Sequence, residues 1–101
     1  MIARLWRGSA GTPAGADAYQ QHVTTKVLPA LRGIEGHRGA RVLRRGEEFI
    51  VVTFWESMDA VRKFAGPDPE RAVVEPEARA VLSSFDDFVR HFELAHATPC
   101  N

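Results

Sequence analysis

The sequence predicts an α+β fold of the ferredoxin-like type, in which the elements follow in the order βαββαβ. The first observation is an apolar segment over residues 49–55, whose β-branched and aromatic side chains are typical of a strand. The second is a helical pattern over residues 57–66, and the third is a turn at Gly46-Glu47 that joins two strands. These elements predict a four-stranded antiparallel sheet with the helices on one face.

The first half of the chain is expected to supply one strand, one helix and one hairpin. Large side chains on both faces indicate a strand over residues 2–7. A helix is expected to begin at Thr12-Pro13, because proline is tolerated in the first turn. Pro29 is expected to end or kink this helix about one turn earlier. The next strand is expected over residues 38–45, before the turn into residues 49–55.

The second half is expected to hold helices and the last strand. Ser57 is the expected N-cap of the helix after residue 55, because its hydroxyl can accept hydrogen bonds from the first free amides. Gly66 is expected to end that helix. A short helix is then expected over residues 68–74, and another begins at Pro76. The last strand is expected over residues 85–94.

Length and composition indicate a single globular domain, expected over residues 1–95, with a tail over residues 96–101. The 13 basic and 13 acidic residues balance, so we expect neither a nucleic-acid partner nor binding to an anionic membrane. No apolar run approaches the roughly 20 residues of a membrane span. The single cysteine, Cys100, cannot form an internal disulfide, and the short apolar N-terminus does not resemble a signal peptide, so a cytoplasmic location is expected.

The predicted sheet has apolar side chains on both faces, although its helices cover only one. Residues 49–55 are almost entirely apolar, and Trp6 lies opposite Leu5 in the first strand. A bare second face would expose a large apolar patch to water. A second copy of the chain, packed sheet against sheet about a two-fold axis, is the simplest cover. We therefore expect a homodimer formed through the sheet faces.

Four segments of the sequence resemble the antibiotic biosynthesis monooxygenase-like family of dimeric α+β barrels. They are residues 1–8, 38–45, 54–66 and 89–94, and the W-E-S-x-x-A segment that starts at Trp55 is the most specific of them. The resemblance implies a ligand pocket between the sheet and the helices of each subunit. It also implies oxidation of aromatic polyketides such as anthrones, with no metal or flavin, because the deprotonated phenolic substrate supplies the electron to oxygen.

The resemblance assigns pocket positions to individual residues of this sequence. Trp55 matches the strand-end tryptophan of the family, whereas Val51 stands where the family has an asparagine and Val61 where it has a tyrosine. A second branch of the family degrades haem with an axial histidine and a helical tryptophan. The tryptophan position matches Phe64 and the histidine position falls near Val74, so haem degradation is not expected.

Three polar residues are candidates for handling a proton or an anion, namely His91, His22 and Arg4. A neutral imidazole near pH 7 can act as general base or acid, although both histidines can equally be structural. Arg4 on a buried strand needs either a carboxylate partner, such as Glu93 or Glu56, or an anionic ligand. The residues expected to bind the substrate are Trp55, Phe64, Tyr19, Val51 and Val61.

The leading hypothesis is a homodimeric, cofactor-independent monooxygenase that acts on a hydrophobic aromatic molecule resembling a polyketide or quinone. The alternative is a non-catalytic protein of the same fold, which binds a small ligand or has a structural role. No cofactor is expected. No metal is expected either, because the four histidines are scattered and the sequence has no cysteine cluster.

Overall fold

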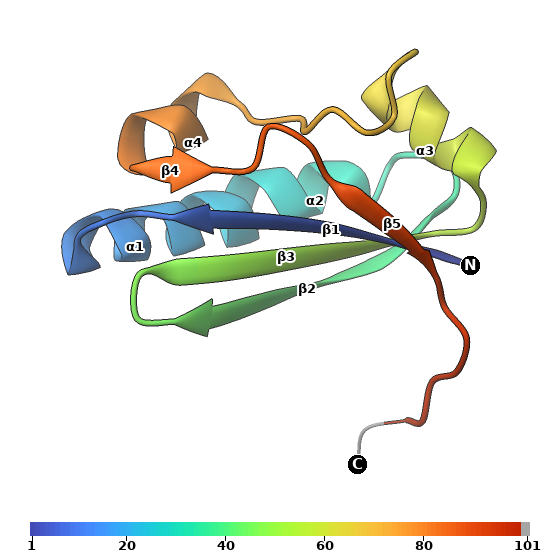
Figure 1. The fold of residues 1–101 in the computed structure, drawn as a ribbon, viewed down its shortest axis with the longest axis horizontal. Helices are drawn as coiled ribbons and strands as arrows, with labels where there is room; N and C mark the ends of the chain where they lie inside the picture. Colours follow the sequence, from blue (N-terminus) through green and yellow to red (C-terminus); the bar gives the residue numbers. More distant parts are fainter. Residues whose placement is uncertain (100–101) are drawn as a thin grey trace.

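A computed structural model describes residues 1–99 and shows an α+β fold of the ferredoxin-like type (Figure 1). The end of the predicted tail, including Cys100, lies outside the described residues. An antiparallel sheet forms one layer, and the helices form the other layer on one of its faces. The predicted fold class is therefore confirmed. No helix within residues 1–99 is both long enough and apolar enough to cross a bilayer.

The sheet is built around the first strand, β1 (Ile2–Ser9). One edge of β1 pairs with β3 (Glu48–Trp55), which pairs in turn with β2 (His37–Arg45). The other edge pairs with two short strands, β4 (Ser84–Phe85) and β5 (Arg90–Glu93). This order, β2-β3-β1 followed by the C-terminal strands, brings the first and last segments of the chain together.

The last strand was predicted to be continuous over residues 85–94, but it is divided into β4 and β5. Between them the chain pairs with the segment that follows α3, where the Ala72 amide donates to Asp87 O at 2.8 Å and the Val89 amide donates to Glu70 O at 2.7 Å. An isolated bridge joins Arg71 to Phe88 in the same region. These hydrogen bonds also explain why the short helix predicted over residues 68–74 does not form, because part of that segment is extended.

The first helix runs without a break from Pro13 to Leu31, as α1 (Pro13–His22), a π-helical segment (Val23–Val27) and α2 (Leu28–Leu31). Pro29 therefore does not end the helix. Instead the hydrogen-bonding pattern widens over the turn before Pro29, where an α-helical arrangement would bring the proline ring against the carbonyl of Thr25. The predicted irregularity lies where it was expected, and its form is a π-helical turn.

Two shorter helices complete the second layer. The helix α3 (Met58–Ala65) begins at Ser57, whose hydroxyl accepts a hydrogen bond from the Ala60 amide at 3.2 Å, as predicted. The helix α4 (Pro76–Val81) packs against α1. In Figure 1 these helices lie at opposite ends of the molecule, and the segment that joins them passes along the same side as the long helix.

Alternation along the strands separates two sets of side chains. Arg4 and Trp6 in β1 pair directly with Thr53 and Val51 in β3, and all four side chains face the helical layer. Their neighbours project to the opposite face, which we call the open face, because no helix covers it. The apolar side chains of β1 and β3 on the open face are Ala3, Leu5, Ile50, Val52 and Phe54.

Candidate functional site

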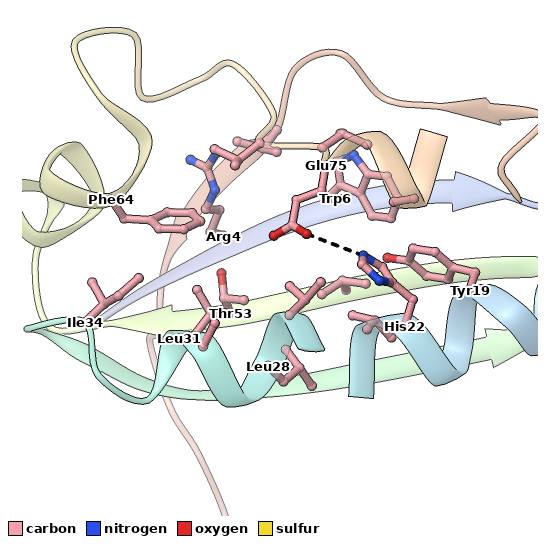
Figure 2. Close-up of a pocket in the computed structure, with 18 residues that line it drawn as sticks. Arg4, Trp6, Tyr19, His22, Leu28, Leu31, Ile34, Thr53, Phe64 and Glu75 are labelled. Carbon is pink, nitrogen blue, oxygen red and sulfur yellow. Dashed lines mark ion pairs between the residues drawn. The ribbon is translucent and has the colours of Figure 1, made fainter. Parts of the chain in front are cut away.

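A cavity of about 280 Å³ lies between the sheet and the helical layer. Its floor comes from β1 and β3, one wall from the long helix, and the other from the segment that leads into α4. Most of the lining is aliphatic or aromatic. The side chains that bring polar atoms to it are Arg4, Trp6, Tyr19, His22, Thr53 and Glu75 (Figure 2).

The structure brings most of the sequence-predicted site residues to this cavity. Those that line it are Arg4, Tyr19, His22, Val51 and Phe64. Those that do not line it are Trp55, Val61 and His91. Trp55 and Val61 are fully buried in the core that adjoins the cavity, and His91 contacts Arg4.

Arg4 is a buried cation without a carboxylate partner. Its side chain donates hydrogen bonds to the backbone carbonyls of Pro69 and Arg71, the second at 2.9 Å, and its guanidinium lies 5.7 Å from the ring centre of Phe64. Within residues 1–99 no carboxylate approaches the guanidinium to 4.0 Å, and Glu56 pairs with Arg38 instead. The expected ion pair to Glu93 or Glu56 is therefore absent.

Burial lowers the pKa of Arg4 to about 10. The lowered pKa means that the folded protein holds this charge at a cost in free energy. Hydrogen bonds to neutral carbonyls satisfy its donors, but they do not compensate its charge. An anionic ligand in the cavity would recover part of this cost.

His91 lies behind Arg4 and fixes its position. Its Nε2 atom is 3.0 Å from Arg4 Nη1. Because arginine can only donate, Nε2 is the acceptor and the ring proton sits on Nδ1. Burial and the nearby positive charge of Arg4 lower the pKa of His91, while Glu70 opposes them. His91 is thus held neutral, and its basic nitrogen is already occupied.

His22 stands at the other end of the cavity, between two carboxylates. Its Nε2 atom lies 3.6 Å from Glu75 and its Nδ1 atom lies 3.3 Å from Glu77 (Figure 2 shows the first pair). Both ring nitrogens are buried, yet within residues 1–99 neither makes a well-aligned hydrogen bond, even to the two carboxylates beside it. Buried polar groups are rarely left in this state unless a ligand or water meets them. His22 is therefore the side chain best placed to exchange a proton with a molecule in the cavity.

Trp55 acts on the cavity through its neighbours. Its indole Nε1 donates to the hydroxyl oxygen of Thr53 at 2.9 Å, and its ring stacks on Phe64 with the ring centres 4.9 Å apart. Thr53 and Phe64 both line the cavity. The tryptophan therefore orients one polar and one aromatic wall residue without contacting the cavity itself.

Sequence reasoning missed Thr53 and Glu75. Thr53 is the one polar residue within residues 49–55. Because strand side chains alternate, a residue two positions before Trp55 faces the same side of the sheet as Trp55, and this alternation could have identified Thr53. Nothing in the sequence singled out Glu75, because it falls between the helix expected over residues 68–74 and the one expected to begin at Pro76. Among residues 1–99 no group of three histidine, cysteine or acidic side chains is arranged to hold a metal ion.

Comparison with protein families finds a match to the antibiotic biosynthesis monooxygenase model over residues 9–76. The chain belongs to the antibiotic biosynthesis monooxygenase family. The predicted family resemblance is therefore confirmed over most of the domain. Comparison with curated protein sequences gives no match.

Solved structures share the fold of this family member across its whole length. SnoaB, a cofactor-independent oxygenase from Streptomyces nogalater, is 16% identical, with 97% of this chain and 96% of that chain covered and a TM-score of 0.63. A monooxygenase from Streptomyces coelicolor in complex with nanaomycin D is 20% identical, with coverage of 99% and 92% and a TM-score of 0.66. MhuD, a haem degrader from Mycobacterium tuberculosis, is 21% identical, with coverage of 98% and 100% and a TM-score of 0.64.

Proposed function

We propose that this protein is a cofactor-independent monooxygenase that oxidises a small phenolic or quinone-like aromatic molecule. The observation that carries the proposal is His22, a buried imidazole that lines an apolar cavity beside two carboxylates and makes no well-aligned hydrogen bond within residues 1–99. Family membership supports the same reaction class. The shared fold of SnoaB is consistent with it.

In this mechanism His22 accepts the proton of the substrate hydroxyl. Glu75 and Glu77 lie 3.6 and 3.3 Å from the ring nitrogens, so they stand beside the positive charge that the ring gains in this step. The hydrogen bond and the charge of Lys26 lower the pKa of Glu77, so this carboxylate stays ionised at neutral pH. His22 can therefore serve as a general base supported by fixed negative charge.

The deprotonated ring then supplies electrons to dioxygen. One oxygen atom enters the ring as a carbonyl, and the other leaves as water with the two hydrogen atoms that the substrate loses. The aliphatic walls contributed by Val23, Leu31 and Val51 keep water away from the reactive anion. The protein thus contributes the base and the dry cavity, and the substrate itself is the reductant.

The other functions considered have less support. The position that matches the axial histidine of haem degraders falls near Val74, an aliphatic residue of the cavity lining that cannot ligate iron. The non-catalytic alternative needs the same cavity, but it leaves the unpartnered imidazole of His22 without a role.

We also propose that the active form is a homodimer joined through the open face. Leu5, Val52 and Phe54 place half-buried apolar side chains there, and Leu43 and Phe92 at its margins are about half exposed. Burying apolar area of this kind against a second copy of the chain would stabilise the dimer.

The test is oxygen uptake by the purified protein on a panel of anthrones and naphthohydroquinones. We expect one O₂ per substrate molecule and a rate at least about 10²-fold lower in His22→Gln, the usual contribution of a general base. His96→Gln is the matched control, because His96 is exposed and distant in the tail. Binding of the panel without oxygen uptake would favour the non-catalytic alternative, and full activity in His22→Gln would remove the proposed base.

A further inference from the structure

The two ends of the cavity carry opposite charges. Figure 2 shows Arg4 and Phe64 on one side, with His22 and Tyr19 on the other and Glu75 directed toward His22. Arg4 supplies an uncompensated positive charge, and Glu75 and Glu77 supply negative charge beside His22. A ligand with an acid group would therefore be held in one orientation, with the acid at Arg4 and away from the carboxylates.

Arg4 also has unused hydrogen-bonding capacity. A guanidinium carries five N–H groups. Within the described part of the chain three of them meet Pro69, Arg71 and His91, whereas the Nε proton and one Nη2 proton have no partner. Only 5% of Arg4 is exposed, so its side chain is packed within the protein rather than extended into bulk solvent. Its three contacts hold the guanidinium in place at the lining of the cavity.

We infer that Arg4 forms a binding site for an already ionised carboxylate, so that the ligand is a hydroxylated aryl carboxylic acid of one or two rings. The acid binds Arg4, and the hydroxyl lies at His22 at the other end. The assignment of the hydroxyl rests on the proposed function, whereas the acid site is a matter of binding alone.

The dimensions of the cavity set the size of this ligand. Its volume of about 280 Å³ lies at the lower limit of the roughly 300–1,000 Å³ that is usual for small-molecule sites. One or two fused rings with two small substituents fit such a volume. Phe64 lines the cavity beside Arg4, so it offers an aromatic contact to the ring that carries the acid.

Calorimetric titration at pH 7 tests the acid site without requiring turnover. The probes are 6-hydroxy-2-naphthoate and its neutral isostere, 6-hydroxy-2-naphthamide. We expect the acid to bind at least about tenfold more tightly than the amide, because the amide keeps one acceptor for Arg4 but lacks the negative charge and the second acceptor oxygen.

Variants assign the preference to one residue. Arg4→Gln is expected to abolish the preference for the acid, and Arg4→Lys is expected to retain part of it because the charge remains. Arg62→Gln is the matched control, since Arg62 is an exposed arginine paired with Asp59 on α3. If Arg4→Gln does not fold, the wild-type comparison of acid and amide and the Arg4→Lys variant still decide the question.

Equal binding of acid and amide by the wild-type protein would overturn the inference, as would an acid preference that survives in Arg4→Gln or a failure of both probes to bind. The outcomes for the two proposals are separable. Tight binding of the acid with no oxygen uptake on any substrate supports the acid site and contradicts the oxygenase. Oxygen uptake on neutral hydroquinones with no acid preference contradicts the acid site alone.

Discussion

Thr53 illustrates at the residue scale how one buried hydrogen bond sets the polarity of a cavity. Its hydroxyl oxygen accepts from Trp55, so the hydroxyl proton is left to point elsewhere. Thr53 also pairs directly with Arg4 across the β1–β3 ladder. Two polar residues of the cavity floor are therefore neighbours on adjacent strands, and each is held by a residue outside the cavity: Thr53 by Trp55 and Arg4 by His91.

The state of His91 leads to a prediction about pH. Its pKa is lowered in the folded protein by burial and by Arg4, so the folded state binds a proton less readily than the unfolded state. Stability is then greatest above about pH 6.5 and falls as the pH drops below the ordinary histidine pKa. We expect His91→Gln, which keeps an acceptor for Arg4, to lose less stability than the wild type between pH 7.5 and 5.5 in urea unfolding.

His37 provides the comparison for this experiment. Burial lowers its pKa as well, so His37 contributes a pH dependence of the same sign and His91→Gln should remove only part of the effect. A wild-type protein whose stability does not change over this interval would contradict the prediction, as would a His91→Gln variant with an unchanged slope.

At the scale of elements, the turn before β2 is fitted closely to α3. Gly36 has a φ of +84°, which disfavours any side chain, and a Cβ at this position would lie 2.4 Å from Cβ of Ala60. We expect Gly36→Ala to destabilise the protein by about 1–3 kcal/mol through strain and displacement of α3. The unfolding free energy in urea measures the effect.

The control for that variant separates backbone strain from steric overlap. Gly46 also has a positive φ, of +61°, but a Cβ there meets nothing within 4 Å. Gly46→Ala should therefore cost less than Gly36→Ala. Equal costs for the two variants would show that the contact with Ala60 is unimportant.

Local patterns predicted most elements because their causes are local. Ser57 caps α3 with its own hydroxyl, and the apolar run of β3 marks a strand that has neighbours on both sides. The errors came from interactions across the chain. Residues 68–74 have a helical composition, but their backbone bonds to residues 87–89, and the same hydrogen bonds interrupt the last strand. No single-segment pattern contains that pairing.

At the scale of the whole molecule, we expect the open face to determine assembly. Val52 pairs with Leu5 within the apolar part of that face. We expect Val52→Asp to convert a dimer into monomers, because a carboxylate cannot be buried there without a partner. Sedimentation velocity at micromolar concentration measures the change.

Thr24→Asp is the matched control, since Thr24 is exposed on the long helix, away from the sheet. A wild-type chain that sediments as a folded monomer at this concentration would contradict the proposed dimer, as would a Val52→Asp variant that remains dimeric.

The candidate site was less predictable than the fold. A positively charged side chain on a buried strand indicated that Arg4 needs an anionic ligand or a carboxylate partner. Only the folded chain reveals that its hydrogen bonds go to backbone carbonyls instead. His22 was indicated by its helical face, whereas its position between Glu75 and Glu77 depends on where the segment before α4 lies. Site geometry is a property of segments that are distant in sequence, and local periodicity does not encode it.

The alternation of β3 has a consequence for how this protein can diversify. Its odd-numbered positions face the helical layer, where Val51 and Thr53 line the cavity, and its even-numbered positions face outward, so point substitutions can change the cavity and the outer surface separately. An insertion or deletion of one residue in the middle of β3 would exchange the two sets in a single step. The length of this strand is therefore under a tighter constraint than its composition, and evolutionary drift in the cavity should proceed by replacement rather than by indels.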